Sequence, residues 1–129
     1  MGNSFDKLKY PLSDLTEKVI GIAINIHKEV GPGFREKYYQ RALYLDFQKA
    51  GLKFEREKKI TLTYRNIVLG YHALDFVVEN SLVVELKSMK ELSDVEIGQL
   101  VSYLRLTGYR VGLLLNFGGS RLEIKRVKV

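Results

Sequence analysis

The N-terminal third of the chain carries hydrophobic residues at helical spacing in two separate runs. The first run follows Asp14 and Glu17, which have the spacing of a capping box, and it stops at Gly31. The second run ends at Gly51, a residue type that commonly terminates helices because it tolerates a left-handed backbone. The pattern therefore predicts two helices, over residues 14–30 and over about residues 36–50.

An alternating pattern of hydrophobic and polar residues follows the two predicted helices. It runs from Ile60 to Tyr64 and resumes at Ile67, with Arg65 and Asn66 between the two runs. This arrangement predicts two antiparallel strands joined by a tight turn. The second strand continues to residue 78, and a turn at residues 79–81 leads into a third strand, residues 82–88. The segment 53–59 mixes charges of both signs and is interpreted as a solvated strand edge.

A third helix and two more strands complete the pattern. Ser93 and Glu96 form a second capping box, and the amphipathic stretch that follows them closes at Gly108. Residues 110–117 are almost uniformly apolar, which is typical of a strand covered on both faces, and a strand–helix–strand connection implies a parallel, right-handed crossover. The last strand, residues 122–129, is basic and suits an exposed edge.

The predicted order of elements, ααβββαββ, defines an α/β fold with a mixed β-sheet flanked by helices. A chain of 129 residues fits one domain, residues 1–129, that buries roughly two-thirds of its unfolded surface. No apolar run is long enough to cross a bilayer, and the N-terminal segment has no apolar stretch of signal-peptide type. We therefore expect a cytoplasmic protein without a membrane partner.

Composition narrows the chemistry that the chain can perform. It contains no cysteine, which excludes disulfides, thiolate zinc sites and a cysteine nucleophile, and leaves oxygen and imidazole ligands for any metal. That ligand set favours a hard ion. The formal net charge of +6 is a weak indication of a polyanionic partner such as nucleic acid.

The predicted strand at residues 82–88 places two opposite charges, Glu85 and Lys87, on one face. Taken alone, this pair is explained by the wet face of a half-buried strand. The preceding turn, however, brings Asp75 within one or two residues of cross-strand pairing with Glu85. Two such carboxylates repel each other unless a proton or a cation lies between them, and Mg²⁺ needs only one or two carboxylates besides water and phosphate oxygens. Lys87 would stand beside the attacking water of a hydrolytic site.

These residues resemble the core of the PD-(D/E)XK nuclease superfamily, in which an acidic residue on one strand is followed by E-x-K on the next. Asp75 corresponds to the first acid, while Leu74 stands where the family name has proline. Gln99 and Tyr103, one turn apart on the third predicted helix, are similar to the Q-x-x-x-Y feature of some exonuclease-like branches.

A second motif near the N-terminus points to one group within that superfamily. Gly33, Glu36 and Tyr39 match the pattern that names the GxxExxY proteins. The resemblance extends from Leu15 to the last strand, and the order of its short motifs makes the combination more specific than any one of them. It implies a restriction-endonuclease-like sheet and a nuclease activity.

The resemblance also implies a role for each matched residue. Asp75 and Glu85 would bind Mg²⁺, for which Mn²⁺ would substitute, and the backbone carbonyl of Leu86 is a further candidate ligand. Lys87 would position the attacking water and stabilise charge on the phosphate. The supporting residues would be Glu36, which completes or orients the metal site, and Gln99 and Tyr103, which contact the substrate backbone or brace Lys87.

Several residues also have plain structural explanations. Glu36 could simply complement the N-terminus of its helix, and Gln99 with Tyr103 could be a solvated pair. Tyr39 fits a core residue with a hydrogen-bonded hydroxyl, and neither His27 nor His72 is assigned a role.

At the level of function, the leading prediction is a metal-dependent nuclease acting on DNA or RNA. The alternatives are a non-catalytic nucleic-acid-binding module and a protein-interaction module on the same fold. A domain this small could use a homodimer to hold a duplex.

Overall fold

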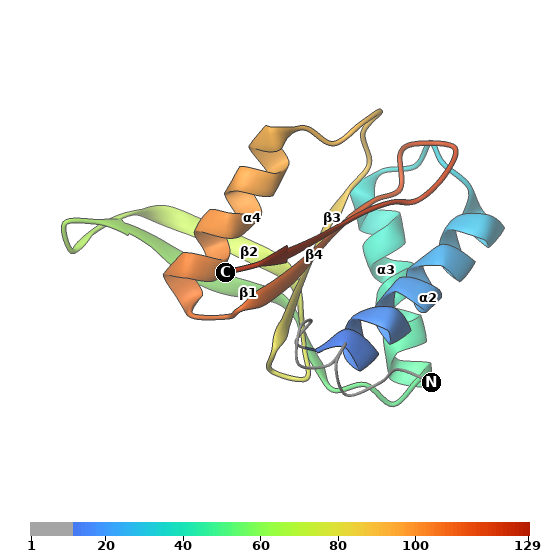
Figure 1. Cartoon of the computed structure of the whole chain (residues 1–129), viewed down its shortest axis with the longest axis horizontal. Coiled ribbons are helices and arrows are strands. Elements are labelled where there is room, and N and C mark those ends of the chain that lie inside the picture. The colour runs from blue at the N-terminus through green and yellow to red at the C-terminus, as the bar shows by residue number, and fades with distance from the viewer. Residues whose placement is uncertain (1–11) are drawn as a thin grey trace.

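The computed structural model describes residues 12–129, so the N-terminal segment on which the expectation about export rests lies outside the described part. Within residues 12–129, three helices and five strands follow one another in the predicted order (Figure 1). Their bounds are α2 (Ser13–Val30), α3 (Glu36–Lys49), β1 (Phe54–Tyr64), β2 (Ile67–Val78), β3 (Leu82–Lys87), α4 (Asp94–Thr107), β4 (Val111–Asn116) and β5 (Glu123–Lys128).

The strands form one mixed sheet in the order β1-β2-β3-β4-β5. Only β3 and β4 are parallel, because α4 connects them; the other neighbours are antiparallel. Helices α2 and α3 cover one face and α4 covers the other (Figure 1). The mixed α/β architecture and the element order predicted from the sequence are therefore confirmed.

The helix ends show where local signals determine the fold and where they do not. At α4, Ser93 accepts a hydrogen bond from the Val95 N–H, and the Glu96 carboxylate accepts one from the Ser93 N–H, so the predicted capping box is confirmed. The capping box predicted at Asp14 is wrong. Helix α2 begins at Ser13, and its N-cap, Leu12, makes no side-chain cap hydrogen bond. Asp14 lies two positions beyond the N-cap, too far along the chain to cap, although its charge suits the first turn of a helix.

Two hydrophobic layers enclose the centre of the sheet. Phe47 of α3 packs edge-to-face on Phe76 of β2 on one side, and Leu100 and Leu104 of α4 are buried on the other. Strand β4 is buried at every position, as its apolar sequence predicts, and β3 is buried from Leu82 to Leu86. The wet-face explanation of β3 is therefore wrong, because α4 covers the face that it would expose.

The hairpin of β1 and β2 extends beyond the body of the protein (Figure 1). Its turn residues Arg65 and Asn66 have φ angles of 49° and 64°, the left-handed pair that a primed hairpin turn requires. The outer half of the hairpin exposes apolar side chains, namely Tyr64, Ile67, Val68, Leu69 and Tyr71. Strand β1 also includes most of the charged segment 53–59, which is thereby confirmed as a mostly solvated strand.

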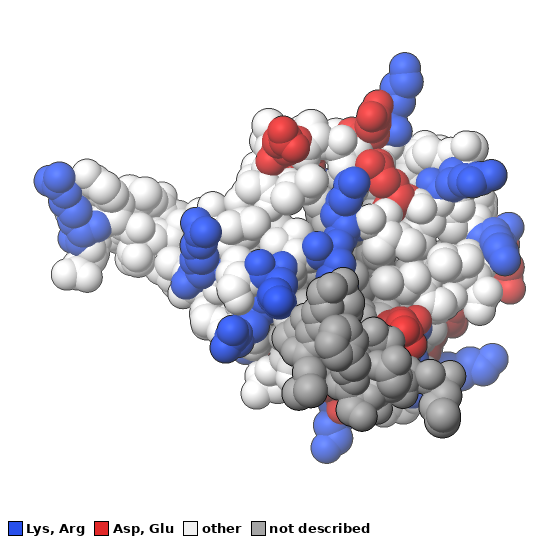
Figure 2. Space-filling model, viewed as in Figure 1, with Lys and Arg blue, Asp and Glu red and all other residues white. Residues whose placement is uncertain are grey.

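The surface of the molecule reflects the formal net charge of +6. Figure 2 shows Lys and Arg side chains spread over one face of the molecule, from the hairpin across β5. None of the helices in residues 12–129 combines the length and apolar character that a membrane span requires.

Candidate active site

The candidate site lies where strands β2 and β3 stop pairing. Their antiparallel ladder runs from Val78↔Leu82 to Phe76↔Val84, and continuing the same register would place Asp75 opposite Glu85. At that point side chains replace the backbone ladder. The Leu86 N–H donates to Asp75 Oδ2 at 2.9 Å, and the Asp75 N–H donates to Glu85 Oε1 at 3.0 Å. Each carboxylate thus satisfies a backbone N–H of the opposite strand.

The neighbouring strand β1 is irregular at the same level. Arg56 pairs with Phe76 and Lys58 pairs with Leu74, so Glu57 lies opposite Asp75 in this register. Glu57 has a φ angle of 55°, which is uncommon for a residue with a Cβ and disrupts the ladder locally. Asp75 is therefore flanked on both sides by strands that depart from regular pairing.

Burial makes the two carboxylates unusually basic. Glu85 is only 6% exposed, and its burial, followed by the charge of Asp75, raises its pKa to about 8. Burial also raises the pKa of Asp75, against the opposing effect of hydrogen bonds from the Leu86 N–H and Gln40. Lys87 lowers both pKa values through its positive charge. The buried pair therefore favours either a proton or a bound cation, because burial disfavours its charged form.

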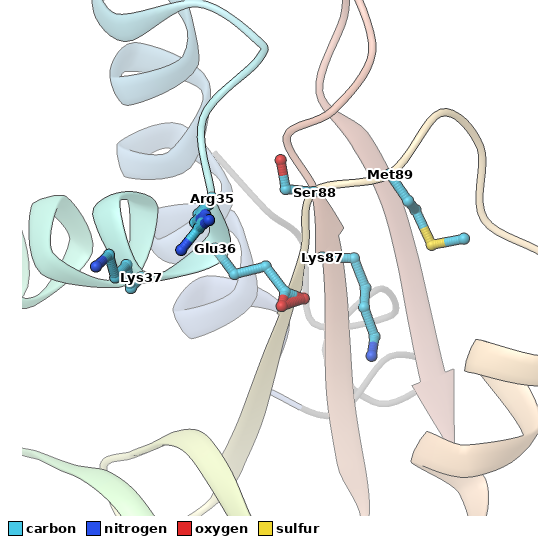
Figure 3. A pocket seen from close by; sticks show the side chains of 6 residues that line it. All are labelled: Arg35, Glu36, Lys37, Lys87, Ser88 and Met89. Carbon is cyan, nitrogen blue, oxygen red and sulfur yellow. The ribbon is translucent and has the colours of Figure 1, made fainter.

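Helix α3 contributes Glu36 and Gln40, which are one turn apart and share a face of the helix. Gln40 Nε2 donates to Asp75 Oδ1 at 2.7 Å. Glu36 is the first residue of α3, so it occupies the helix N-terminus, and its side chain also reaches toward Lys87 at the end of β3 (Figure 3). Burial raises the pKa of Glu36, Lys87 lowers it and Asp75 raises it, which places Glu36 within electrostatic reach of both residues.

Helix α4 closes the opposite side of the site. Tyr103 stacks on His72 of β2, with ring centroids 4.1 Å apart and planes at 14°. His72 Nε2 lies 3.4 Å from Glu85 Oε2, while burial lowers the pKa of His72. Gln99 and Tyr103 line one small cleft together with His72, Glu85 and Lys87, so they border Glu85.

A larger cleft adjoins the site at the end of β3. Its volume is about 540 Å³, and Figure 3 shows the side chains that line it: Arg35, Glu36, Lys37, Lys87, Ser88 and Met89. Lys87 lines both clefts. The recessed carboxylates are therefore next to an open, largely cationic surface.

Gln40 and His72 also belong to this cluster, although the sequence pattern did not assign either of them to it. A signal for Gln40 was available, because it follows Glu36 by one helical turn. A signal for His72 was its spacing from Leu74. Residues two apart in a strand share a face, and Leu74 packs on the α4 face of the sheet. By contrast, His27 lies away from the site and contacts the Gly119 carbonyl at 2.9 Å. Tyr39 is a core residue, as expected, and its hydroxyl donates to the Gly31 carbonyl at 2.6 Å.

The donor set is compatible with a hard divalent ion. Within residues 12–129, no three His, Cys, Asp or Glu side chains are grouped so that they could hold a metal by themselves. Mg²⁺ does not require such a group, since it retains water ligands and shares phosphate oxygens with its substrate. The carboxylates of Asp75 and Glu85 supply oxygen donors, and burial, the main cause of their raised pKa values, makes a neutralising proton or cation favourable there.

The sheet and the site together define a restriction-endonuclease-like α/β protein. The family model of the PD-(D/E)XK nuclease superfamily matches residues 13–127, so the chain belongs to this superfamily. Nucleases of this superfamily generally use divalent metal ions. Comparisons with curated proteins and with solved structures gave no significant match.

Proposed function

We propose that the protein is a metal-dependent nuclease that hydrolyses phosphodiester bonds of DNA or RNA with an activated water. The observation that carries this proposal is the arrangement at the fork of β2 and β3. Asp75 and Glu85 are joined there through backbone hydrogen bonds, and Lys87 follows on the same strand. Membership of a nuclease superfamily supports the reaction class.

Asp75 and Glu85 would hold the metal ion, Mg²⁺ or Mn²⁺ as its substitute. The backbone carbonyl of Leu86 is a further candidate ligand, and Glu36 would complete or orient the set from α3. A bound divalent ion lowers the pKa of water and shields the negative charge of the phosphate. Without that ion, burial and mutual repulsion favour protonation of the pair, so metal and protons would compete for the same oxygens.

Lys87 would orient the attacking water and stabilise charge that develops on the phosphate. Its cationic side chain lies at the junction of the two clefts, within electrostatic reach of Asp75, Glu85 and Glu36. Gln99 and Tyr103 would contact the substrate backbone or brace Lys87. These roles suit the positions of the residues where β2 and β3 separate. The ligand Glu85 is buried, and Lys87 lines both clefts.

The narrower family group and the binding partner are also part of this proposal. Gly33, Glu36 and Tyr39 support membership of the GxxExxY group, because Glu36 approaches the acidic cluster and Tyr39 anchors the preceding turn. Nucleic acid is the proposed partner. The cytoplasmic location, the single domain and the homodimer stay predictions from the sequence.

The decisive experiment is divalent-ion-dependent cleavage of single- and double-stranded DNA and RNA by the purified protein. Lys87→Ala should bind metal normally and lose cleavage on the order of a hundredfold or more, as expected for a residue that serves the water. Glu85→Gln should lose both metal binding and cleavage. The matched control, Lys18→Ala, removes an exposed lysine from α2 and should cleave like the wild type.

Two outcomes would contradict the proposal. Equal cleavage by the wild type, Lys87→Ala and Glu85→Gln would indicate a contaminating nuclease. Metal binding without cleavage of any of the substrates would favour the non-catalytic nucleic-acid-binding module.

A further inference from the structure

Two aromatic side chains are exposed at the N-terminal end of α3, the helix that contributes Glu36 to the candidate site. Phe34 precedes α3 and is 49% exposed, and Tyr38 lies in the first turn of α3 and is 54% exposed. Their rings meet edge to face, with centroids 6.3 Å apart. Exposed aromatic rings in contact with each other are available for stacking on a ligand.

The backbone that carries Phe34 is anchored on both sides. Its N–H donates to the Tyr39 hydroxyl at 3.3 Å, and its carbonyl accepts a hydrogen bond from the Ser88 hydroxyl. Tyr39 itself is fully buried and stacks on Phe117, with centroids 4.4 Å apart. The exposed ring of Phe34 therefore stands on a preorganised turn, and Ser88 ties that turn to the residue next to Lys87.

The surroundings of the two rings are cationic. A cleft of about 410 Å³ runs between Phe34, Arg35 and Lys90, and it shares Arg35, Ser88 and Met89 with the cleft that contains Lys87. Lys37 lies next to Tyr38, its Nζ 5.2 Å from the ring centroid. Aromatic platforms interleaved with positive charges bind nucleic acid by stacking on bases and contacting phosphates.

We propose that Phe34 and Tyr38 stack on unpaired bases and that the substrate of the site is single-stranded nucleic acid. The proposal rests on the nuclease function proposed above and specifies its substrate class. Bases in a duplex are paired and stacked on each other, so they cannot offer their faces to these rings. A flexible strand can also lead its phosphate toward Glu85, which is only 6% exposed in a small cleft that α4 borders.

The test is a binding measurement in chelator, where metal-dependent cleavage is suppressed. Fluorescence anisotropy would compare a labelled deoxyoligonucleotide with its duplex, using the wild type and a Phe34→Ala/Tyr38→Ala variant. We expect the wild type to prefer the single strand. The variant should lose single-strand affinity by on the order of tenfold or more and keep its weaker duplex affinity, because base–aromatic stacking is lost.

Two further variants distinguish loss of base stacking from loss of folding and from non-specific binding to exposed aromatic residues. Phe34→Trp/Tyr38→Phe retains aromatic rings and should bind the single strand like the wild type. Tyr64→Ala/Tyr71→Ala removes two equally exposed tyrosines from the distant hairpin and should have no effect. If the double alanine variant does not fold, Tyr38→Ala, on the helix surface, replaces it and should still weaken single-strand binding.

The proposal is overturned if the folded alanine variant binds the single strand as tightly as the wild type, if the wild type prefers the duplex, or if it binds neither at low salt. These results are distinct from failure of the nuclease function. Absence of cleavage with the expected binding pattern would refute the activity and retain the stacking platform.

Discussion

Replacing Glu85 with glutamine should stabilise the metal-free protein at pH values near 8, although the substitution removes a proposed metal ligand. Glu85 is buried, and burial together with the charge of Asp75 raises its pKa from 4.5 to about 8. Glutamine is neutral, and its amide oxygen can still accept the hydrogen bond from the Asp75 N–H. The substitution therefore removes a buried charge and keeps the contact between the strands.

The magnitude follows from the linkage between proton binding and folding. Because the folded protein holds the Glu85 proton more tightly than the unfolded chain, this carboxyl contributes fully to the free energy of unfolding below pH 4.5, and the contribution is lost as the pH rises to 8. The gap between 4.5 and about 8, at about 1.36 kcal/mol per pKa unit, gives an upper limit of about 5 kcal/mol. The variant should match the wild type below pH 4.5 and exceed it by about 2 to 5 kcal/mol at pH 8.

Urea unfolding followed by circular dichroism, in chelator and at several pH values across this window, measures the difference directly. The control Glu17→Gln changes an exposed glutamate on α2 and should show no comparable gain with pH. A stability difference between Glu85→Gln and the wild type that stays constant from pH 4.5 to 8 would refute the reasoning, as would a wild type that is more stable at pH 8.

Three further predictions concern the same cluster and its ligand. Asp75→Ala should be less stable than Asp75→Asn by about 1–3 kcal/mol in urea unfolding, because only asparagine keeps an acceptor for the Leu86 N–H; equal stabilities would contradict this. Tyr103→Ala should lose about 0.5–1.5 kcal/mol of ring stacking on His72 and Tyr103→Phe should lose little, and a loss of the same size in both would argue against the stack. Nucleic-acid affinity should fall steeply as salt rises, because phosphate contacts release counterions, and salt-independent binding would favour a protein-interaction module.

The elements predicted best from the sequence are those whose signals are local. The capping box at Ser93 and Glu96 and the turn at Arg65 and Asn66 each depend on a few consecutive residues, and both are confirmed. The start of α2 was missed because the competing cap at Asp14 has the right spacing, and spacing alone does not tell where the chain enters the helix. The solvated part of β1 has no hydrophobic alternation, because an edge strand can be exposed to solvent on both faces. Its sequence therefore gives no periodic signal of a strand.

The candidate site was predictable to the extent that a hairpin determines it. The short turn between Asp75 and Glu85 brings them within one or two residues of cross-strand pairing, whatever the exact register. The burial of Glu85 was not predictable from β3 alone, because it depends on α4 packing over that face. Gln40 joins the acidic residues from α3, so the tertiary arrangement brings its amide to Asp75, whereas His72 lies on the same strand as Asp75 and approaches Glu85 of the neighbouring strand.

The carboxylates of Asp75 and Glu85 each accept a hydrogen bond from a backbone N–H of the neighbouring strand, and this has an evolutionary consequence. A descendant of this protein that no longer hydrolyses phosphodiesters would be free to lose its negative charges, but not to lose the acceptors for the Leu86 and Asp75 N–H groups. Apolar replacements would leave buried amides unpaired. Inactive descendants should therefore carry asparagine at position 75 and glutamine at position 85, and those amides would mark the loss of chemistry while the fold persists.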